Sequence, residues 1–191
     1  MRNLATAAAA AIVLLAGQGG VAEADAGSAE RLVGLLAERL ATADTVAVIK
    51  WEAAVRDGGE PAIDDPGREA AIYDAMAQAG AERGLPGGLV RQVFQGQIEA
   101  NKFVQRGLVT EWRYGLAVAG VPGMDLADVR PVIDGLNTAI LAELASERME
   151  LAAVDCPARV AAGVVDIAGS KRLDALHAAA LVRASTPVCD G

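Results

Sequence analysis

The fold class is decided by residues 32–51, which read LVGLLAERLATADTVAVIKW. Their apolar side chains return every three or four residues, the spacing that gathers them on one face of an α-helix. This face consists of Leu32, Leu35, Leu36, Leu40, Val46 and Ile49. Ser28 is a suitable N-cap upstream, and Gly58, Gly59 and Pro61 break the pattern downstream. The sequence therefore predicts a long helix over 28–56 whose apolar face must be covered by other elements.

Helical periodicity continues along the rest of the chain, and no segment alternates apolar and polar residues in the manner of a strand. Asp64-Asp65-Pro66-Gly67 is typical of a helix start, because a carboxylate caps the first turn and proline fits there. Glycine and proline in 84–88 and 115–125 predict turns. We expect an all-α single bundle of about six helices, located near 28–56, 66–84, 86–113, 125 or 128 to 154, 157–167 and 170–184.

The first 26 residues have the composition of a secretory signal peptide. Arg2 precedes an apolar run, 4–17, and small residues alternate in 22–26 as a signal peptidase requires. An uncleaved membrane anchor is the alternative, but the run is shorter than the roughly 18 to 20 residues that a spanning helix needs. We therefore expect residues 1–26 to be removed, the remaining 27–191 to form one domain, and the protein to be periplasmic or secreted, with no membrane attachment after cleavage.

The two cysteines, Cys156 and Cys189, both fall in the exported part of the chain. An even number of cysteines in an oxidising compartment favours a disulfide, here one that pins the C-terminal tail. Together with the single histidine, His177, they supply too few ligands for a closed zinc site. His177 fits a half-buried helix position better than a catalytic base. We expect the disulfide, no metal and no cofactor.

The formal net charge of −8 argues against nucleic acid and anionic membranes as partners. Polar residues nevertheless recur inside the apolar stripes. Arg39 and Lys50 are eleven residues apart, which returns them to nearly the same helix face, and Asn101 and Gln105 are spaced i,i+4. Inward cations are costly unless something anionic meets them. This pattern suggests an anionic small-molecule ligand.

Six short segments, spread over nearly the whole mature chain, carry a family resemblance. They are AERL (37–40), VIKW (48–51), DPGRE (65–69), QIEANKFVQ (97–105), VR (129–130) and IDGLN (133–137). In this order and spacing, with a leader and a late cysteine pair, the chain resembles the secreted or periplasmic class of the all-helical chorismate mutases. The resemblance implies a type II-like helical bundle that rearranges chorismate to prephenate, an intramolecular Claisen reaction with no covalent intermediate and no cofactor.

The resemblance also implies a role for each cation. Arg39 and Arg130 would bind the carboxylates of the dianionic substrate, and Arg68 would belong to the same cationic wall. Lys50 would donate a hydrogen bond to the ether oxygen whose bond breaks. A homodimer is implied as well, with each site built from one chain. Arg130 would be the arginine that each chain supplies to its own site.

The remaining site residues implied by the resemblance are uncharged or acidic. Gln105 would join Lys50 at the ether oxygen, and Asn101 would contact a carboxylate. Glu69 would accept from the ring hydroxyl, and Asp65 would hold the polar wall in place.

The chain departs from the family pattern at two positions. Ile72 stands where some members have glutamine, and Gln105 where some have glutamate. Because glutamine donates a hydrogen bond at any pH, we expect a rate that is nearly flat from mildly acidic to mildly basic pH.

Each candidate residue also has a purely structural interpretation. Arg39 and Lys50 would snorkel from a helix edge, Asp65 would be only an N-cap, and Glu69 would only favour the helix dipole. Asn101 and Gln105 would hydrogen-bond to other helices, and Arg130 would pair with Asp134. For Lys102 we expect a solvent-facing side chain, and for Trp51 and Trp112 a packing role.

Two other functions remain open at this level. One is a non-catalytic exported protein that keeps the scaffold and binds an anionic metabolite or a protein partner. The other is a structural bundle, in which the inward cations tolerate replacement by alanine. Turnover of chorismate separates both from an enzyme.

Overall fold

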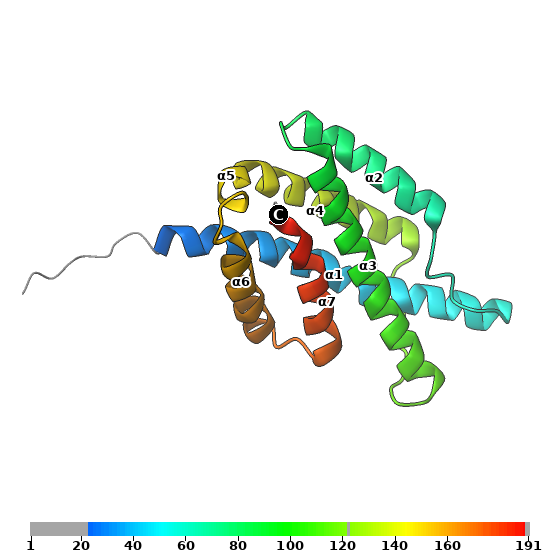
Figure 1. The fold of residues 1–191 in the computed structure, drawn as a ribbon. Coiled ribbons are helices and arrows are strands. Elements are labelled where there is room, and N and C mark those ends of the chain that lie inside the picture. The colour runs from blue at the N-terminus through cyan, green and yellow to red at the C-terminus, as the bar shows by residue number, and fades with distance from the viewer. Residues whose placement is uncertain (1–22, 122, 190–191) are drawn as a thin grey trace, which may run out of the picture.

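The computed structural model describes residues 23–121 and 123–189, and all regular elements in these two ranges are helices (Figure 1). In chain order they are α1 (Glu23–Asp57), α2 (Pro66–Ala81), α3 (Gly87–Arg113), α4 (Leu126–Ser146), α5 (Arg148–Leu151), α6 (Cys156–Ser170), α7 (Ala175–Ser185) and the 3-10 helix η1 (Thr186–Val188). The all-α prediction is confirmed. Residues 115–121 and 123–125 contain no helix, as expected.

Three predicted boundaries are wrong. The last helix, expected to start at residue 170, begins at Ala175, because α6 itself continues to Ser170. The helix expected to run to residue 154 ends at Ser146, and α5 follows as a separate turn. This break lets the chain bury Leu151 and Cys156, which are 4% and 1% exposed. Helix α1 begins at Glu23, not at Ser28. Most of the predicted signal peptide, residues 1–22, lies outside the described residues.

Local sequence explains the start of α2. The Asp65 side chain accepts a hydrogen bond from the Arg68 backbone N–H at 3.1 Å, and Pro66 occupies the first turn. The Glu69 carboxylate accepts in return from the Asp65 backbone N–H at 3.3 Å. At the other end, Gly84 has φ +74°, a left-handed conformation that suits glycine in the turn before α3.

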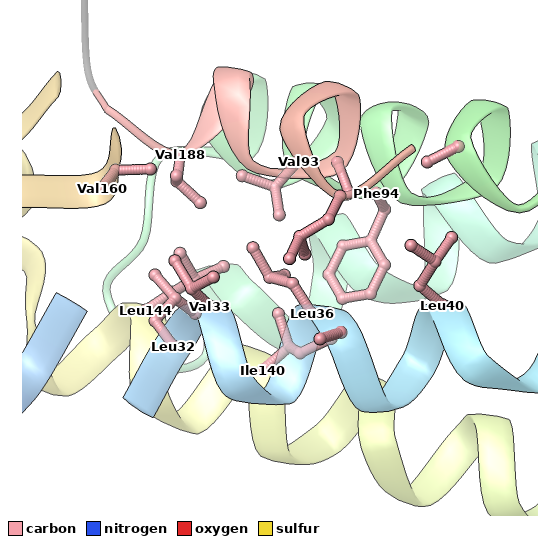
Figure 2. Close-up of a cluster of buried hydrophobic side chains, with 14 of the residues drawn as sticks. Leu32, Val33, Leu36, Leu40, Val93, Phe94, Ile140, Leu144, Val160 and Val188 are labelled. Carbon is pink, nitrogen blue, oxygen red and sulfur yellow. The ribbon is translucent and has the colours of Figure 1, made fainter. Parts of the chain in front are cut away.

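Helix α1 is the central element, and α3, α4, α6 and α7 pack against it, while α2 packs on α3 (Figure 1). The core lies between these helices, where Phe94 of α3 reaches toward Leu36 and Leu40 of α1 (Figure 2). Phe94 and Leu36 are completely buried. Near the C-terminal ends of α1 and α3, the rings of Trp51 and Trp112 pack edge to face, with their centroids 5.9 Å apart. This contact confirms their packing role.

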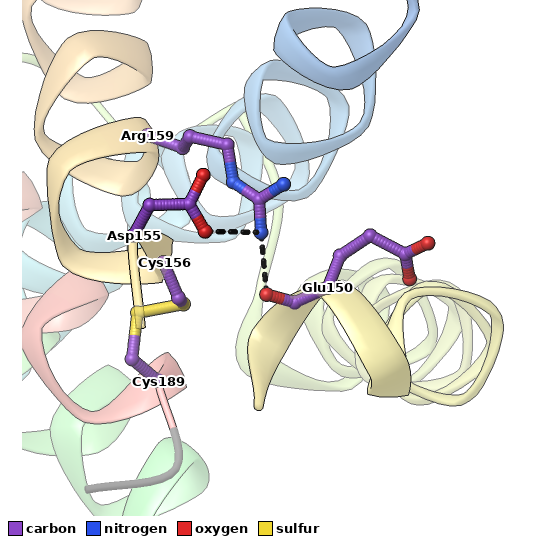
Figure 3. The surroundings of a disulfide bond; sticks show 5 residues. All are labelled: Glu150, Asp155, Cys156, Arg159 and Cys189. Atoms are coloured by element: carbon purple, nitrogen blue, oxygen red, sulfur yellow. Dashed lines mark hydrogen bonds and ion pairs between the residues drawn. A yellow bond between two sulfur atoms is a disulfide. The ribbon is translucent and has the colours of Figure 1, made fainter. Parts of the chain in front are cut away.

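The predicted disulfide joins Cys156 to Cys189 (Figure 3). It fastens the start of α6 to the segment after η1 and so pins the tail against the bundle. Arg159 supports the same corner, with its guanidinium near the Asp155 carboxylate and the Glu150 carbonyl. In the two described ranges, no helix is long and apolar enough to cross a membrane.

Candidate active site

A cleft of about 440 Å³ opens between α1, the α1–α2 segment, the start of α2 and the start of α4. Four of the sequence-predicted residues line it: Lys50, Asp65, Arg68 and Arg130. The apolar part of the wall comes from Val46, Ile49, Ala53, Ala54, Leu126, Val129 and Ile133. Three cations from three helices share this cleft with three carboxylates, those of Asp57, Glu60 and Asp65. The lining has no net positive charge, so an anion would have to be bound locally, by the cations themselves.

Lys50 is half-buried in this cleft, and its ammonium donates a hydrogen bond to the Ile63 carbonyl at 3.0 Å. Burial lowers the pKa of Lys50, and the carboxylates of Asp65, Asp64 and Glu69 offset part of that effect. Only one of its three donors is used in this contact. The ammonium is thus anchored and still able to donate into the cleft.

Arg39 is buried, with 4% of its surface exposed, so the interpretation that it snorkels to solvent is wrong. Its Nε donates to the Asn137 Oδ1 of α4 at 2.6 Å. Burial lowers the pKa of Arg39 to about 10, although the charges of Asp134 and Tyr73 act in the opposite direction. The guanidinium remains charged at neutral pH in a place where its charge is costly.

Asn101 and Gln105 of α3 extend this buried polar cluster. The Gln105 side-chain amide donates to Asn101 Oδ1 at 2.7 Å, and the Asn101 amide lies 3.5 Å from the Arg39 carbonyl and from Thr42 Oγ1. Among the described residues, Gln105 Oε1 is buried without a hydrogen-bond partner. An unpaired buried oxygen is unfavourable, so this amide is not fully satisfied by the protein.

The structure therefore divides the predicted residues into two groups along α1. Arg39, Asn101 and Gln105 form the buried cluster, and Lys50 lies in the cleft. Along the axis of α1, the backbone of Lys50 is about 16 Å from that of Arg39. Between them, the same stretch of α1 carries the small buried side chains Ala43 and Ala47. Arg39 and Lys50 can therefore contact the same ligand only because both side chains are long.

Glu69 differs from the other candidates because its carboxylate is already paired with a cation of the protein. Lys102 donates to both Glu69 oxygens, at 3.1 and 3.2 Å, and also pairs with Asp64 and Glu99. The expectation that Lys102 faces solvent is wrong, since 8% of its surface is exposed. The i,i+3 spacing of Glu99 and Lys102 was visible in the sequence. The sequence did not show that the carboxylates of Asp64 and Glu69 also pair with Lys102.

Sequence reasoning also missed Asn137 and Ile63 as partners of the two central cations. Asn137 lies seven residues after Arg130, which places both on one face of α4 and was a usable signal. The contact of Lys50 with Ile63 is made by a backbone carbonyl, and no side-chain pattern predicts it. Ile72 is half-buried on α2.

His177 has a structural role. Its two ring nitrogens lie 2.8 Å from Asp174, the N-cap of α7, and 2.8 Å from Asp44 of α1. It is half-buried, as expected, and lines a separate hollow of about 630 Å³ that contains none of the predicted site residues. Over residues 23–121 and 123–189, His, Cys, Asp and Glu do not gather in a group that fits a metal ion.

Comparisons with known proteins agree on one family. Residues 29–106 match the family model described as chorismate mutase type II. The chain is 32% identical to the secreted chorismate mutase of Mycobacterium tuberculosis, covering 83% of this chain and 76% of the relative. It is also 32% identical to that of Mycolicibacterium smegmatis, covering 95% and 98%.

Solved structures give the same result. A chorismate mutase from Burkholderia phymatum superposes with a TM-score of 0.80 at 37% identity, covering 88% of this chain and 99% of that one. One from Burkholderia thailandensis gives a TM-score of 0.77 at 31% identity, covering 85% and 99%.

Proposed function

Since the chain belongs to the type II chorismate mutase family, we propose that the cleft and the buried cluster beside it together form the site at which chorismate rearranges to prephenate. The protein is an exported isomerase, in keeping with its relatives named secreted chorismate mutases. In our proposal the exported form is residues 27–191, and residues 1–26 are the signal peptide.

The observation that carries the site assignment is the buried charge of Arg39. In the described part of the chain no carboxylate lies within ion-pair distance of its guanidinium, and its side-chain partner is the neutral amide of Asn137. A buried cation without a counterion destabilises a fold. A substrate carboxylate would supply the missing charge and accept from the Nη donors that Arg39 has left.

The second carboxylate of chorismate would bind to Arg68 and Arg130 at the wall of the cleft. Asn101 would add a hydrogen bond from the buried side, and Asp65 would keep Arg68 in place by capping α2. Fixing both carboxylates holds the flexible substrate in the folded conformation in which its two reacting carbons meet. Such positioning accounts for a large part of the rate of a unimolecular rearrangement.

The ether oxygen would lie between Lys50 and Gln105. As the carbon–oxygen bond breaks and the new carbon–carbon bond forms within the same molecule, negative charge develops on this oxygen. An ammonium from one side and an amide N–H from the other stabilise that charge more in the transition state than in the substrate. Glu69 would accept from the ring hydroxyl while it remains paired with Lys102.

A homodimer in which each chain contains a complete site is the oligomeric part of the proposal. All eight residues belong to α1, α2, α3 and α4 or their caps in one chain. Nothing in the chemistry above needs a group from a partner subunit.

The test of the reaction is the loss of chorismate absorbance by the purified exported protein, with prephenate identified as the product. We expect Lys50→Ala and Arg39→Ala to fold and to lose at least about 100-fold in kcat/KM, the usual effect of removing one transition-state donor. Arg91→Ala, which removes a cation of the exposed pair with Asp74, is the control and should keep full activity. A folded wild type that binds chorismate without converting it would replace this proposal with a binding function.

The test of the oligomeric proposal is a mixture of two inactive variants, Arg39→Ala and Arg130→Ala. If each site lies within one chain, mixed dimers contain two defective sites and no activity returns. If Arg130 acted on the partner's site, one site in each mixed dimer would be intact and about a quarter of the activity would reappear. Sedimentation of the wild type as a monomer would also contradict the dimer.

A further inference from the structure

Lys102 of α3 contacts three carboxylates, which lie in the α1–α2 segment, in α2 and on α3 itself. Its Nζ lies 3.2 Å from Asp64 Oδ1 in the α1–α2 segment, 3.1 Å from Glu69 Oε2 in the first turn of α2, and 2.5 Å from Glu99 Oε1 on its own helix α3. Only 8% of Lys102 is exposed, whereas more than half of the Asp64 side chain is exposed. Lys102 is thus the inner anchor of the group.

The segment that Lys102 anchors carries much of the proposed site. Asp64 follows Ile63, whose carbonyl accepts from the Lys50 ammonium at 3.0 Å. Glu69 follows Arg68, and its carboxylate also accepts from the Asp65 backbone N–H. If the segment moves away from α3, Lys50 loses its anchor and Arg68 loses its position.

The charges of this group also lie next to a site that must attract a dianion. Three carboxylates converge there, and Lys102 is the one cation among the described residues that contacts all of them. Arg106 of α3 binds Asp64 at 2.7 Å, and Arg183 of α7 lies 3.5 Å from Glu99. The other titratable side chains that face this group are Tyr73 of α2 and Lys50 of α1. Without Lys102, Glu69 would have no cation in contact among the described residues.

We infer that Lys102 is a positioning residue for the rearrangement, which holds residues 63–69 against α3 and cancels the negative field of Asp64, Glu69 and Glu99 beside the dianion. The inference rests on the proposed function. It assigns to Lys102 no contact with the substrate, because its ammonium is occupied by the three carboxylates.

The permanent charge of Lys102 gives this role a signature that a purely structural lysine lacks. Burial lowers the pKa of Lys102, but hydrogen bonds to Glu99, Glu69 and Asp64 raise it well above the ordinary lysine value, so it stays charged throughout the working range. Hydrogen bonds from Arg106 and then Lys102 hold the pKa of Asp64 below its usual value. Removing Lys102 therefore takes positive charge away from the carboxylates of Asp64, Glu69 and Glu99, whose negative field then acts on the dianion. Substrate carboxylates remain ionised above about pH 5.

The experiment measures kcat and KM for chorismate between pH 5 and 8.5 in the wild-type protein, Lys102→Met and Lys102→Arg. For Lys102→Met we expect kcat/KM to fall by about 10- to 100-fold at pH 7.5, the scale of a small displacement in a site. KM should change more than kcat, because carboxylates without their cation repel the dianion before it binds. Lys102→Arg should restore most of the activity and the flat profile of the wild type. Arg91→Met removes an exposed cation of the same helix and is the matched control.

The outcomes separate the inference from the proposed function. Equal kcat/KM in wild type and Lys102→Met, or a loss confined to kcat with KM unchanged, overturns the inference and leaves the function intact. A folded wild type without turnover overturns both. If Lys102→Met does not fold, Lys102→Met/Glu99→Gln removes one of the three carboxylates and relieves part of the repulsion. We expect it to show the same rise in KM at a smaller amplitude, and a wild-type KM would again overturn the inference.

Discussion

Replacing Arg39 by methionine should abolish activity without destabilising the fold. The cation is buried, and burial lowers its pKa from the ordinary arginine value to about 10, which corresponds to a cost of about 3 kcal/mol for holding the charged form in the folded protein. Methionine fills similar space without this cost. Against that gain, Asn137 Oδ1 loses the hydrogen bond from Arg39 Nε, which costs about 1 to 3 kcal/mol for a buried acceptor.

The balance predicts that Arg39→Met raises the free energy of unfolding by zero to about 2 kcal/mol. For a domain of this size the melting temperature would rise by no more than about 8 °C. The double variant Arg39→Met/Asn137→Leu removes the orphaned acceptor as well and should be more stable than the wild type by about 3 kcal/mol. Urea unfolding and chorismate turnover are measured on the same samples. A loss of more than about 3 kcal/mol in Arg39→Met would refute the electrostatic reasoning, and retained turnover would refute the substrate role.

Three other predictions follow from the same structure. Gln105→Glu should confine activity to acid, because a buried carboxyl has a raised pKa and donates to an ether oxygen only when protonated; a rate profile as flat as that of the wild type would contradict this. Replacing both Cys156 and Cys189 by serine should lower the free energy of unfolding by about 3 to 4 kcal/mol for a bridge 33 residues apart, while kcat at 20 °C stays unchanged because the bridge lies outside the cleft. Burial lowers the pKa of His177, but the carboxylates of Asp44 and Asp174 raise it overall, so its stabilisation is complete below about pH 6.5 and is lost as the pH rises through the folded-state pKa. His177→Gln should therefore lose stability at pH 5.5 and change little at pH 9, and an equal loss at both values would show that the charge of His177 is unimportant.

Local signals predicted the parts of this fold that local contacts stabilise. The start of α2 follows from Asp65 and Pro66 alone, and the structure has the cap where the sequence indicated it. The break between α4 and α5 was not predictable in this way. No glycine or proline marks it, and it forms because Leu151 and Cys156 are drawn into the core by contacts with distant parts of the chain.

The candidate site shows the same distinction. Helical spacing correctly predicted that Arg39 and Gln105 are buried, because periodicity indicates which face of a helix is buried. It failed for Lys102, a lysine flanked by an exposed phenylalanine, since its burial depends on carboxylates more than thirty residues upstream. Pairing between residues of different helices depends on how the helices pack in the folded bundle. A single sequence shows which residue types are present but not which of them pair.

The most direct test of the account is the conversion of chorismate by the purified exported protein, with Lys50→Ala measured beside it and nothing but buffer and substrate added. The account predicts prephenate as the product of the wild type and a loss of at least about 100-fold in kcat/KM for a folded Lys50→Ala. Equal turnover by the two proteins would contradict the assignment of the cleft as the site of reaction.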